Sequence, residues 1–160
     1  MPQLVPQDLS YLETAKQRLD FSHVVQASPE RVFAVLADGA SWPRWFVDFK
    51  RAEQTSPGPL GLGGTRHVWV GPLNLEERFI AWEPGRRFSF TMLTINLPLV
   101  TSLLEDWRLT PEGSGTRVDY AVRFDVPWWL RPFTKLLLLK FRPMFRKALP
   151  NLETYLRNNP

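Results

Sequence analysis

The sequence predicts an α+β fold, in which an antiparallel sheet of six or seven strands is covered by one long C-terminal helix. Residues 50–125 alternate apolar and polar side chains with a period of two, and turn residues interrupt the pattern roughly every ten residues. Residues 127–158 return to helical spacing. Short turns favour antiparallel neighbours, and a sheet with one apolar face needs a cover. Only the C-terminal segment is long enough to supply it.

The first elements of the chain are expected to be a strand and two short helices. The segment RLDFSHVVQ, residues 18–26, alternates as a half-buried strand. The helix SPERVFAVLADG begins with Ser28 as N-cap and Pro29 in its first turn, and it ends at Gly39. A second helical turn, SWPRWF, follows almost at once.

The length of 160 residues suits a single domain. We expect residues 18–160 to form that domain and residues 1–17 to be an N-terminal extension, with a loose helix over residues 7–16.

The remaining strands are expected in the segments TRHVWVG, PLNLEERFIAWEPG, RRFSFTMLTI, LVTSLLEDWRLT and TRVDYAVRFDV. In the last three, alternation places one mostly apolar face toward the core: Phe88, Phe90, Met92, Leu103, Glu105, Trp107, Leu109, Val118, Tyr120, Val122 and Phe124. The opposite faces of RRFSFTMLTI and TRVDYAVRFDV, which include Ser89, Thr91 and Arg123, are expected to face solvent. In TRHVWVG the alternation leaves open whether Arg66 or His67 points inward.

The composition excludes several classes of site. Cysteine is absent and there are only two histidines, so we expect no disulfide, no thiol catalysis, no metal and no cofactor. Seven Trp and eleven Phe beside only three Tyr favour a wide core or an apolar cavity. The net charge of +4 permits contact with anionic surfaces but selects none.

Three further motifs are missing or weak. The first residues, MPQLVPQDLSYLETAKQRL, lack the basic and long apolar regions of a secretory signal, so we expect a cytoplasmic protein. GLGG at residues 61–64 leads into a strand rather than a helix, which favours a turn over a phosphate site. No set of serine, histidine and acid lies on a recognisable nucleophile turn.

Four segments occur in an order and spacing that resembles the polyketide cyclase/dehydrase branch of the SRPBCC superfamily, the START-related and birch-pollen-allergen-like proteins. They are SPERVFAVLADGASWPRWF, GPLGLGGTRHVWV, AWEPGRRFSF and DWRLTPEGSGTRVDY. The resemblance covers roughly residues 18–158 and implies a helix-grip fold, in which a curved sheet wraps the C-terminal helix around a deep cavity. It also implies that the cavity binds lipids, sterols, hormones, polyketides or quinone-like molecules, and that a minority of members catalyse cyclisation, aromatisation or dehydration. The positions that match the family's scaffold and turns are Trp45, Gly63, Trp82, Trp107, Gly115 and Thr116.

The C-terminal segment predicts an amphipathic helix. Its apolar stripe is Leu130, Phe133, Leu137, Phe141, Met144, Phe145, Ala148, Leu152 and Tyr155, and its basic side is Arg131, Lys135, Arg142 and Arg146. The longest uncharged apolar run is the four leucines 136–139, which is too short for a membrane span. Pro143 and Pro150 each remove a backbone hydrogen bond, so the helix is expected to bend or break there.

An apolar spot is expected on the basic side of this helix. Leu139 falls within the basic side, with Leu138 at its edge and Trp128 and Trp129 just before it. Such a surface could contact an anionic membrane or a second subunit, or it could have no partner. Nucleic acid is not expected, because the cations lie on one helix without a docking motif.

The candidate ligand-binding residues are mostly inward-facing and apolar or aromatic: Trp69, Phe79, Phe88, Phe90, Met92, Trp107, Tyr120, Phe133, Leu137, Phe141 and Met144. The candidate catalytic residues are His23, as acid or base, and Glu105, which would orient it. Both also have a structural interpretation, His23 as a hydrogen-bonded inner-face residue and Glu105 as the partner of an arginine. Glu77 has a weaker case, because the neighbouring Glu76 leaves its side of the strand uncertain.

Three functions follow from these patterns. The first is binding of a hydrophobic small molecule or lipid in a cavity between sheet and helix. The second is a cyclase or dehydratase that uses His23 and Glu105. The third is docking to a membrane or a partner through the basic helix, as a monomer or a homodimer.

Overall fold

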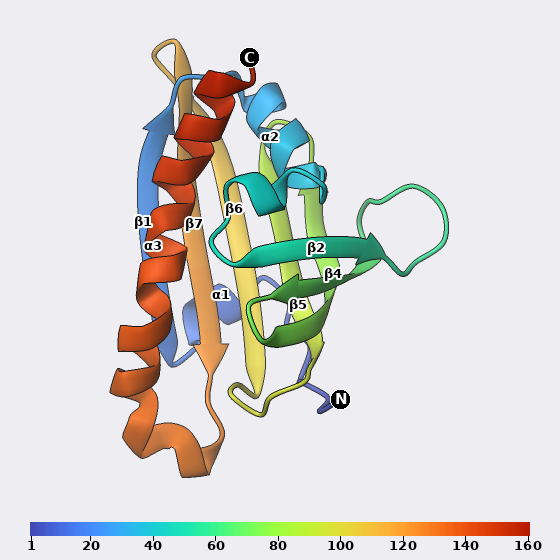
Figure 1. Ribbon diagram of the computed structural model, residues 1–160, viewed down its shortest axis with the longest axis vertical. Coiled ribbons are helices and arrows are strands. Elements are labelled where there is room, and N and C mark those ends of the chain that lie inside the picture. The colour runs from blue at the N-terminus through green and yellow to red at the C-terminus, as the bar shows by residue number, and fades with distance from the viewer.

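The computed structural model describes all 160 residues and confirms a helix-grip fold built on one antiparallel sheet. Its seven strands are β1 (Gln17–Val25), β2 (Phe49–Gln54), β3 (Thr65–Val70), β4 (Leu73–Glu83), β5 (Arg87–Ile95), β6 (Ser102–Glu112) and β7 (Gly115–Asp125). Their order across the sheet is β1-β7-β6-β5-β4-β3-β2, so β1 and β2 form its two edges (Figure 1).

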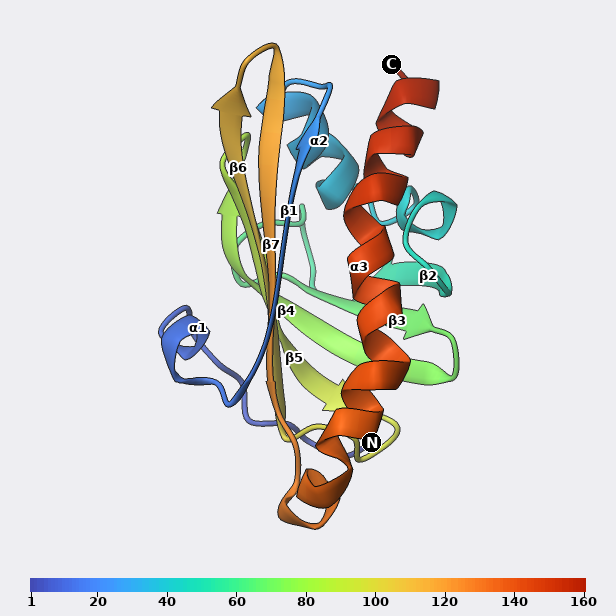
Figure 2. The ribbon, with the colours of Figure 1, turned by 90° about the vertical axis from the view of Figure 1, so that its left-hand side faces the viewer.

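The helices are α1 (Tyr11–Thr14), α2 (Pro29–Ala37), the 3₁₀ turns η1 (Trp42–Arg44) and η2 (Trp128–Phe133), and α3 (Thr134–Asn158). Figure 2 shows α2 and α3 on one side of the sheet, with α1 on the other. The predicted N-cap of α2 is present, because Arg31 N donates a hydrogen bond to Ser28 Oγ. The two short helices expected after the first strand are therefore α2 and η1.

The long helix α3 is continuous through both of its prolines, so of the expected bend or break, a break does not occur. Each proline removes only one backbone hydrogen bond, and the second half of α3 is held by packing against the sheet. All its buried residues lie there: Phe145, Ala148, Leu149, Leu152 and Leu156. The first half has no buried residue and is held less firmly. None of the helices combines the length and the apolar character needed to cross a bilayer.

The N-terminal segment packs on the outer face of the sheet, which corrects one expectation. Ser89 and Thr91 are buried rather than solvent-facing. Thr91 Oγ1 accepts a hydrogen bond of 2.9 Å from Gln7 N, and the Tyr11 hydroxyl donates one of 3.0 Å to Asp125. The expected helix over residues 7–16 is reduced to the single turn α1, because these residues follow the sheet surface.

Arg123 is another outer-face residue that is buried rather than exposed. Its Nη2 lies 2.8 Å from Asp20 Oδ1, and its Nε donates to the carbonyl of Leu12. The arginine therefore joins the N-terminal segment to β1 and β7.

Candidate functional site

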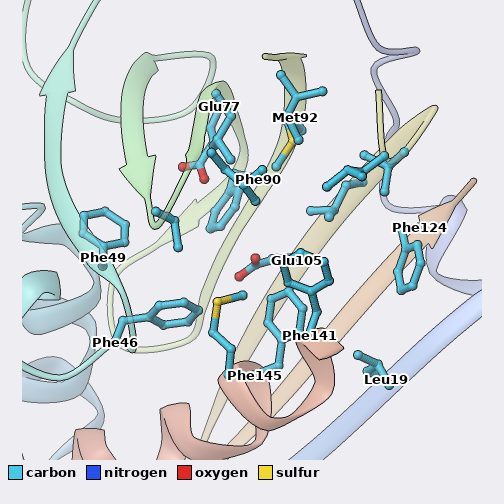
Figure 3. Close-up of a pocket in the computed structure, with 18 of the residues that line it drawn as sticks. Leu19, Phe46, Phe49, Glu77, Phe90, Met92, Glu105, Phe124, Phe141 and Phe145 are labelled. Atoms are coloured by element: carbon cyan, nitrogen blue, oxygen red, sulfur yellow. The ribbon is translucent and has the colours of Figure 1, made fainter. Parts of the chain in front are cut away.

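An apolar cavity lies between the inner face of the sheet and the first half of α3. Its volume is about 90 Å³, and 19 of its 21 lining residues are hydrophobic. The remaining two are Glu77 and Glu105, whose carboxyl groups are drawn among the aromatic rings in Figure 3. The lining comes from strands of the inner face, the η1 region, the loop between β5 and β6, and α3.

The structure brings part of the predicted set together around this cavity. The candidates that line it are Phe90, Met92, Glu105, Leu137, Phe141 and Met144. A second group is buried on the inner face without lining the cavity: Phe79, Phe88, Trp107 and Tyr120. These four side chains pack in the core next to the cavity lining. The rings of Trp107 and Tyr120, for example, stack with their centroids 3.7 Å apart.

Two candidates point away from the cavity. Trp69 lies on the outer side of β3, where its ring stacks on His67, because the buried side of that strand carries Arg66 and Val68. Phe133 is 56% exposed, because it belongs to η2 and α3 begins only at Thr134. The helical stripe drawn from the sequence therefore does not extend back to it.

The expected pairing of His23 with Glu105 does not form. Across β7, His23 faces Val118 whereas Glu105 faces Val122, so the two differ by four residues along the strand, roughly 13 Å. His23 lies instead beside Glu153 of α3, with Nε2 and Oε2 3.7 Å apart. His23 thus lies at the edge of the sheet beside α3 and outside the cavity lining.

A buried ion pair forms one part of the polar cluster at the cavity. Arg66 Nε donates to Glu77 Oε2 at 2.7 Å, and both side chains are almost fully buried. The Arg66 guanidinium also lies 5.0–5.8 Å from the centroids of four aromatic rings, those of Trp42, Phe79, Phe88 and Phe90. Its Nη2 has no hydrogen-bond partner. Burial raises the pKa of Glu77, and the charge of Arg66 opposes that rise.

Glu105 forms the other part of the cluster and has no cation in hydrogen-bond contact. Its Oε2 accepts a hydrogen bond of 2.7 Å from the Tyr120 hydroxyl. Burial, followed by the negative charge of Glu77, raises the pKa of Glu105 to about 8. At neutral pH Glu105 is therefore mostly protonated, and it lies beside the ion pair of Arg66 and Glu77.

Sequence reasoning missed the ion pair, although a signal for it is present. The turn between β3 and β4 contains only Gly71, at a φ of 54°, and Pro72. A two-residue turn sets the register of a hairpin, here Val70 opposite Leu73 and consequently Arg66 opposite Glu77. Opposite charges at paired positions would have placed both on the same face.

The aromatic wall beside η1 was also missed. Trp42, Phe46 and Phe49 line the cavity, and Trp42 is fixed by a hydrogen bond of 2.9 Å from its Nε1 to the carbonyl of Leu36. These residues follow one another in a short irregular segment, so neither a period of two nor a helical period identifies the side they present.

Sequence relatives of this chain match it over nearly its whole length. A family profile described as polyketide cyclase/dehydrase and lipid transport matches residues 16–157. Uncharacterised proteins of Mycobacterium tuberculosis and Mycobacterium bovis are each 34% identical over 151 residues, which span 94% of this chain and 86% of theirs.

The similar solved structures share the fold at low sequence identity. A protein of Thermus thermophilus has a TM-score of 0.74 at 18% identity, over 90% of this chain and 100% of that one. The Zhui aromatase/cyclase from Streptomyces sp. R1128 has a TM-score of 0.68 at 17% identity, over 90% and 96%. Ara h 8.0201 has a TM-score of 0.63 at 14% identity, over 89% and 99%. With the family profile matching almost the whole domain, the chain belongs to the polyketide cyclase/dehydrase and lipid transport family of the SRPBCC superfamily.

Proposed function

We propose that the protein binds a hydrophobic small molecule, or the apolar part of a lipid, in the cavity between the sheet and α3. The observation that carries this proposal is the lining, in which 19 of 21 residues are hydrophobic. A charged solute would lose its hydration there, and only Glu77 and Glu105 could compensate it. The family description, which includes lipid transport, supports the same class of ligand.

The polar cluster suggests what the buried end of the ligand carries. Glu105, with a pKa of about 8, is mostly protonated at neutral pH. A protonated carboxyl group can donate one hydrogen bond and accept others. A ligand carbonyl or hydroxyl group fits this requirement.

The size of the cavity implies that α3 moves when a large ligand enters. An apolar cavity of about 150 Å³ accepts benzene, and the cavity here measures about 90 Å³. The residues of α3 that close it, Leu137, Leu138, Phe141 and Met144, are only half-buried. We expect this first half of α3 to shift outward while the part from Phe145 onward stays packed.

A neutral fluorescent probe, N-phenyl-1-naphthylamine, tests the proposal. Leu103 lines the cavity from β6, so Leu103→Trp should fill it and weaken probe binding at least about tenfold. Leu62→Trp, at an exposed loop position, serves as the matched control and should leave binding unchanged. Equal probe binding by both variants, with both still folded by thermal unfolding, would rule out this cavity as the binding site.

One observation favours a second candidate, a cyclase or dehydratase. A buried carboxyl group with a pKa of about 8 has the properties of a general acid or base near neutral pH. In this version Glu105 transfers the proton itself, without His23. Turnover of a poly-β-keto thioester, followed by mass spectrometry, should be abolished in Glu105→Gln and retained in His23→Ala. Loss of turnover in His23→Ala alone would contradict that assignment.

A further inference from the structure

An exposed apolar surface lies on η2 and on the side of α3 that faces away from the cavity. We call it the docking face, and its residues are Trp128, Trp129, Phe133, Leu136 and Leu139. All five are more than one third exposed, from 47% for Trp129 to 77% for Trp128. Apolar side chains gathered in this way on a surface mark an interaction site more often than scattered ones do.

The docking face is surrounded by positive charge that no acid neutralises. Six cations lie between residues 126 and 152, all of them exposed: Arg131, Lys135, Lys140, Arg142, Arg146 and Lys147. None of the six forms an ion pair. The segment contains no Asp or Glu, so it carries +6 while the whole chain carries +4, which leaves −2 for all other residues. Positive charge is therefore concentrated at this one place.

We propose that the docking face binds the surface of an anionic lipid bilayer. Exposed Trp and Leu side chains can enter the boundary between headgroups and acyl chains, while the surrounding Lys and Arg side chains contact anionic headgroups. A second copy of the chain fits less well, because a two-fold contact would bring the same six cations against one another. Base recognition needs acceptors as well as donors, and the side chains at the centre of the face offer only the indole N–H donors of Trp128 and Trp129.

The position of the docking face suits the transfer of a ligand between the membrane and the cavity. Such a transfer rests on the proposed function, whereas docking itself does not require the ligand. Figure 1 shows η2, the start of α3 and the loop between β5 and β6 at the same end of the molecule. That loop contributes Leu99 and Val100 to the cavity lining, and α3 contributes Leu137 and Leu138. A bilayer bound at this end would lie next to the part of α3 that closes the cavity.

Sedimentation of the full chain with lipid vesicles tests the proposal. We expect binding to phosphatidylcholine vesicles that contain about 30 mol% phosphatidylserine, and much weaker binding to pure phosphatidylcholine. Raising the salt from about 0.1 M to about 0.5 M should reduce binding at least tenfold. The double variant Lys135→Gln, Lys140→Gln should bind roughly 25-fold more weakly, because each cation near the surface contributes about fivefold.

Two controls separate the docking face from the rest of the surface. Lys16 and Lys50 are exposed and unpaired outside α3, so replacing both by Gln should change binding less than about twofold. Leu139→Gln should reduce binding at least about tenfold, whereas Leu62→Gln, at an equally exposed loop position, should not.

Three results would overturn the proposal. The first is equal binding to neutral and anionic vesicles. The second is a loss of vesicle binding in the Lys16 and Lys50 variant as large as that in the Lys135 and Lys140 variant. The third is a dimer in sedimentation equilibrium that Leu139→Gln dissociates. Probe binding in the cavity is measured without vesicles, so a failure of docking and a failure of the proposed function give different results.

Discussion

The hydroxyl of Tyr120 donates a hydrogen bond of 2.7 Å to Oε2 of Glu105, and both side chains are buried. Burial and the charge of Glu77 raise the pKa of Glu105, and the hydrogen bond from Tyr120 opposes that rise without cancelling it. The protonation state of Glu105 therefore depends in part on Tyr120. Because this protonation state affects the unfolding free energy, stability measurements can test it.

The unfolding free energy should decrease as the pH rises, because of Glu105. In the folded protein Glu105 keeps its proton up to about pH 8, whereas its ordinary pKa is 4.5. Between these two values the folded state binds more protons than the unfolded state, so rising pH favours unfolding. Glu105→Gln cannot ionise, and its stability relative to the wild type should increase by roughly 1.4 kcal/mol per pH unit in this window. Urea unfolding at several pH values measures the difference.

The control for this experiment is Glu53→Gln, which removes an exposed carboxylate of β2. Its stability relative to the wild type should stay nearly constant over the same pH range. If the stability of Glu105→Gln relative to the wild type were also constant, the pKa of Glu105 in the folded state would equal its ordinary value.

Tyr120→Phe should raise the pKa of Glu105 further, because the hydroxyl favours the ionised form of the carboxyl group. The loss of a buried hydrogen bond should also lower the unfolding free energy by about 1–2 kcal/mol at pH 5. The pKa can be followed by the ¹³C chemical shift of the Glu105 carboxyl group. A pKa that falls in Tyr120→Phe would contradict the proposed role of the hydroxyl.

The buried pair Arg66 and Glu77 should show strong coupling in a double-mutant cycle. Arg66→Met leaves the Glu77 carboxylate buried without its cation, and should cost about 3–5 kcal/mol. Adding Glu77→Gln should recover a large part of that loss, because the unpaired charge is removed. The exposed pair Arg51 and Glu53 provides the comparison, with an expected coupling below about 1 kcal/mol. Equal coupling in both pairs would show that burial does not determine the strength of the inner pair.

The sheet and its covering helix were predictable because their patterns are long and regular. Alternation over β5, β6 and β7 identified the inner face, including the inward position of Glu105. In β3 the alternation was ambiguous, since each face combined polar and apolar residues, and Arg66 could not be assigned to a side. The register of the β3–β4 hairpin, which depends on the turn, places Arg66 on the same face as Glu77, and the burial of both residues shows that this face points inward.

The site was less predictable because it depends on contacts between distant segments. His23 and Glu105 both lie on inward faces, but sequence alternation does not measure their separation along β7. The outer face of the sheet was wrongly predicted to face solvent. Alternation shows which side chains share a face, but it does not show whether another segment covers that face. Here the N-terminal segment covers it, as the hydrogen bond from Gln7 to Thr91 demonstrates.

Gly115→Ala should destabilise the fold strongly, because the first residue of β7 touches the end of β1. A Cβ atom at Gly115 would overlap the carbonyl oxygen of Val25, so one of the two backbones would have to move. We expect a loss of about 3 kcal/mol or more, since crowding of the interior by a single side chain typically costs about 1–3 kcal/mol and backbone relaxes less easily than a side chain. Gly61→Ala is the matched control, because a Cβ atom there meets nothing within 4 Å, and its effect should stay within about 1 kcal/mol. Thermal unfolding of both variants measures the difference, and similar melting temperatures would show that the contact between β1 and β7 relaxes without cost.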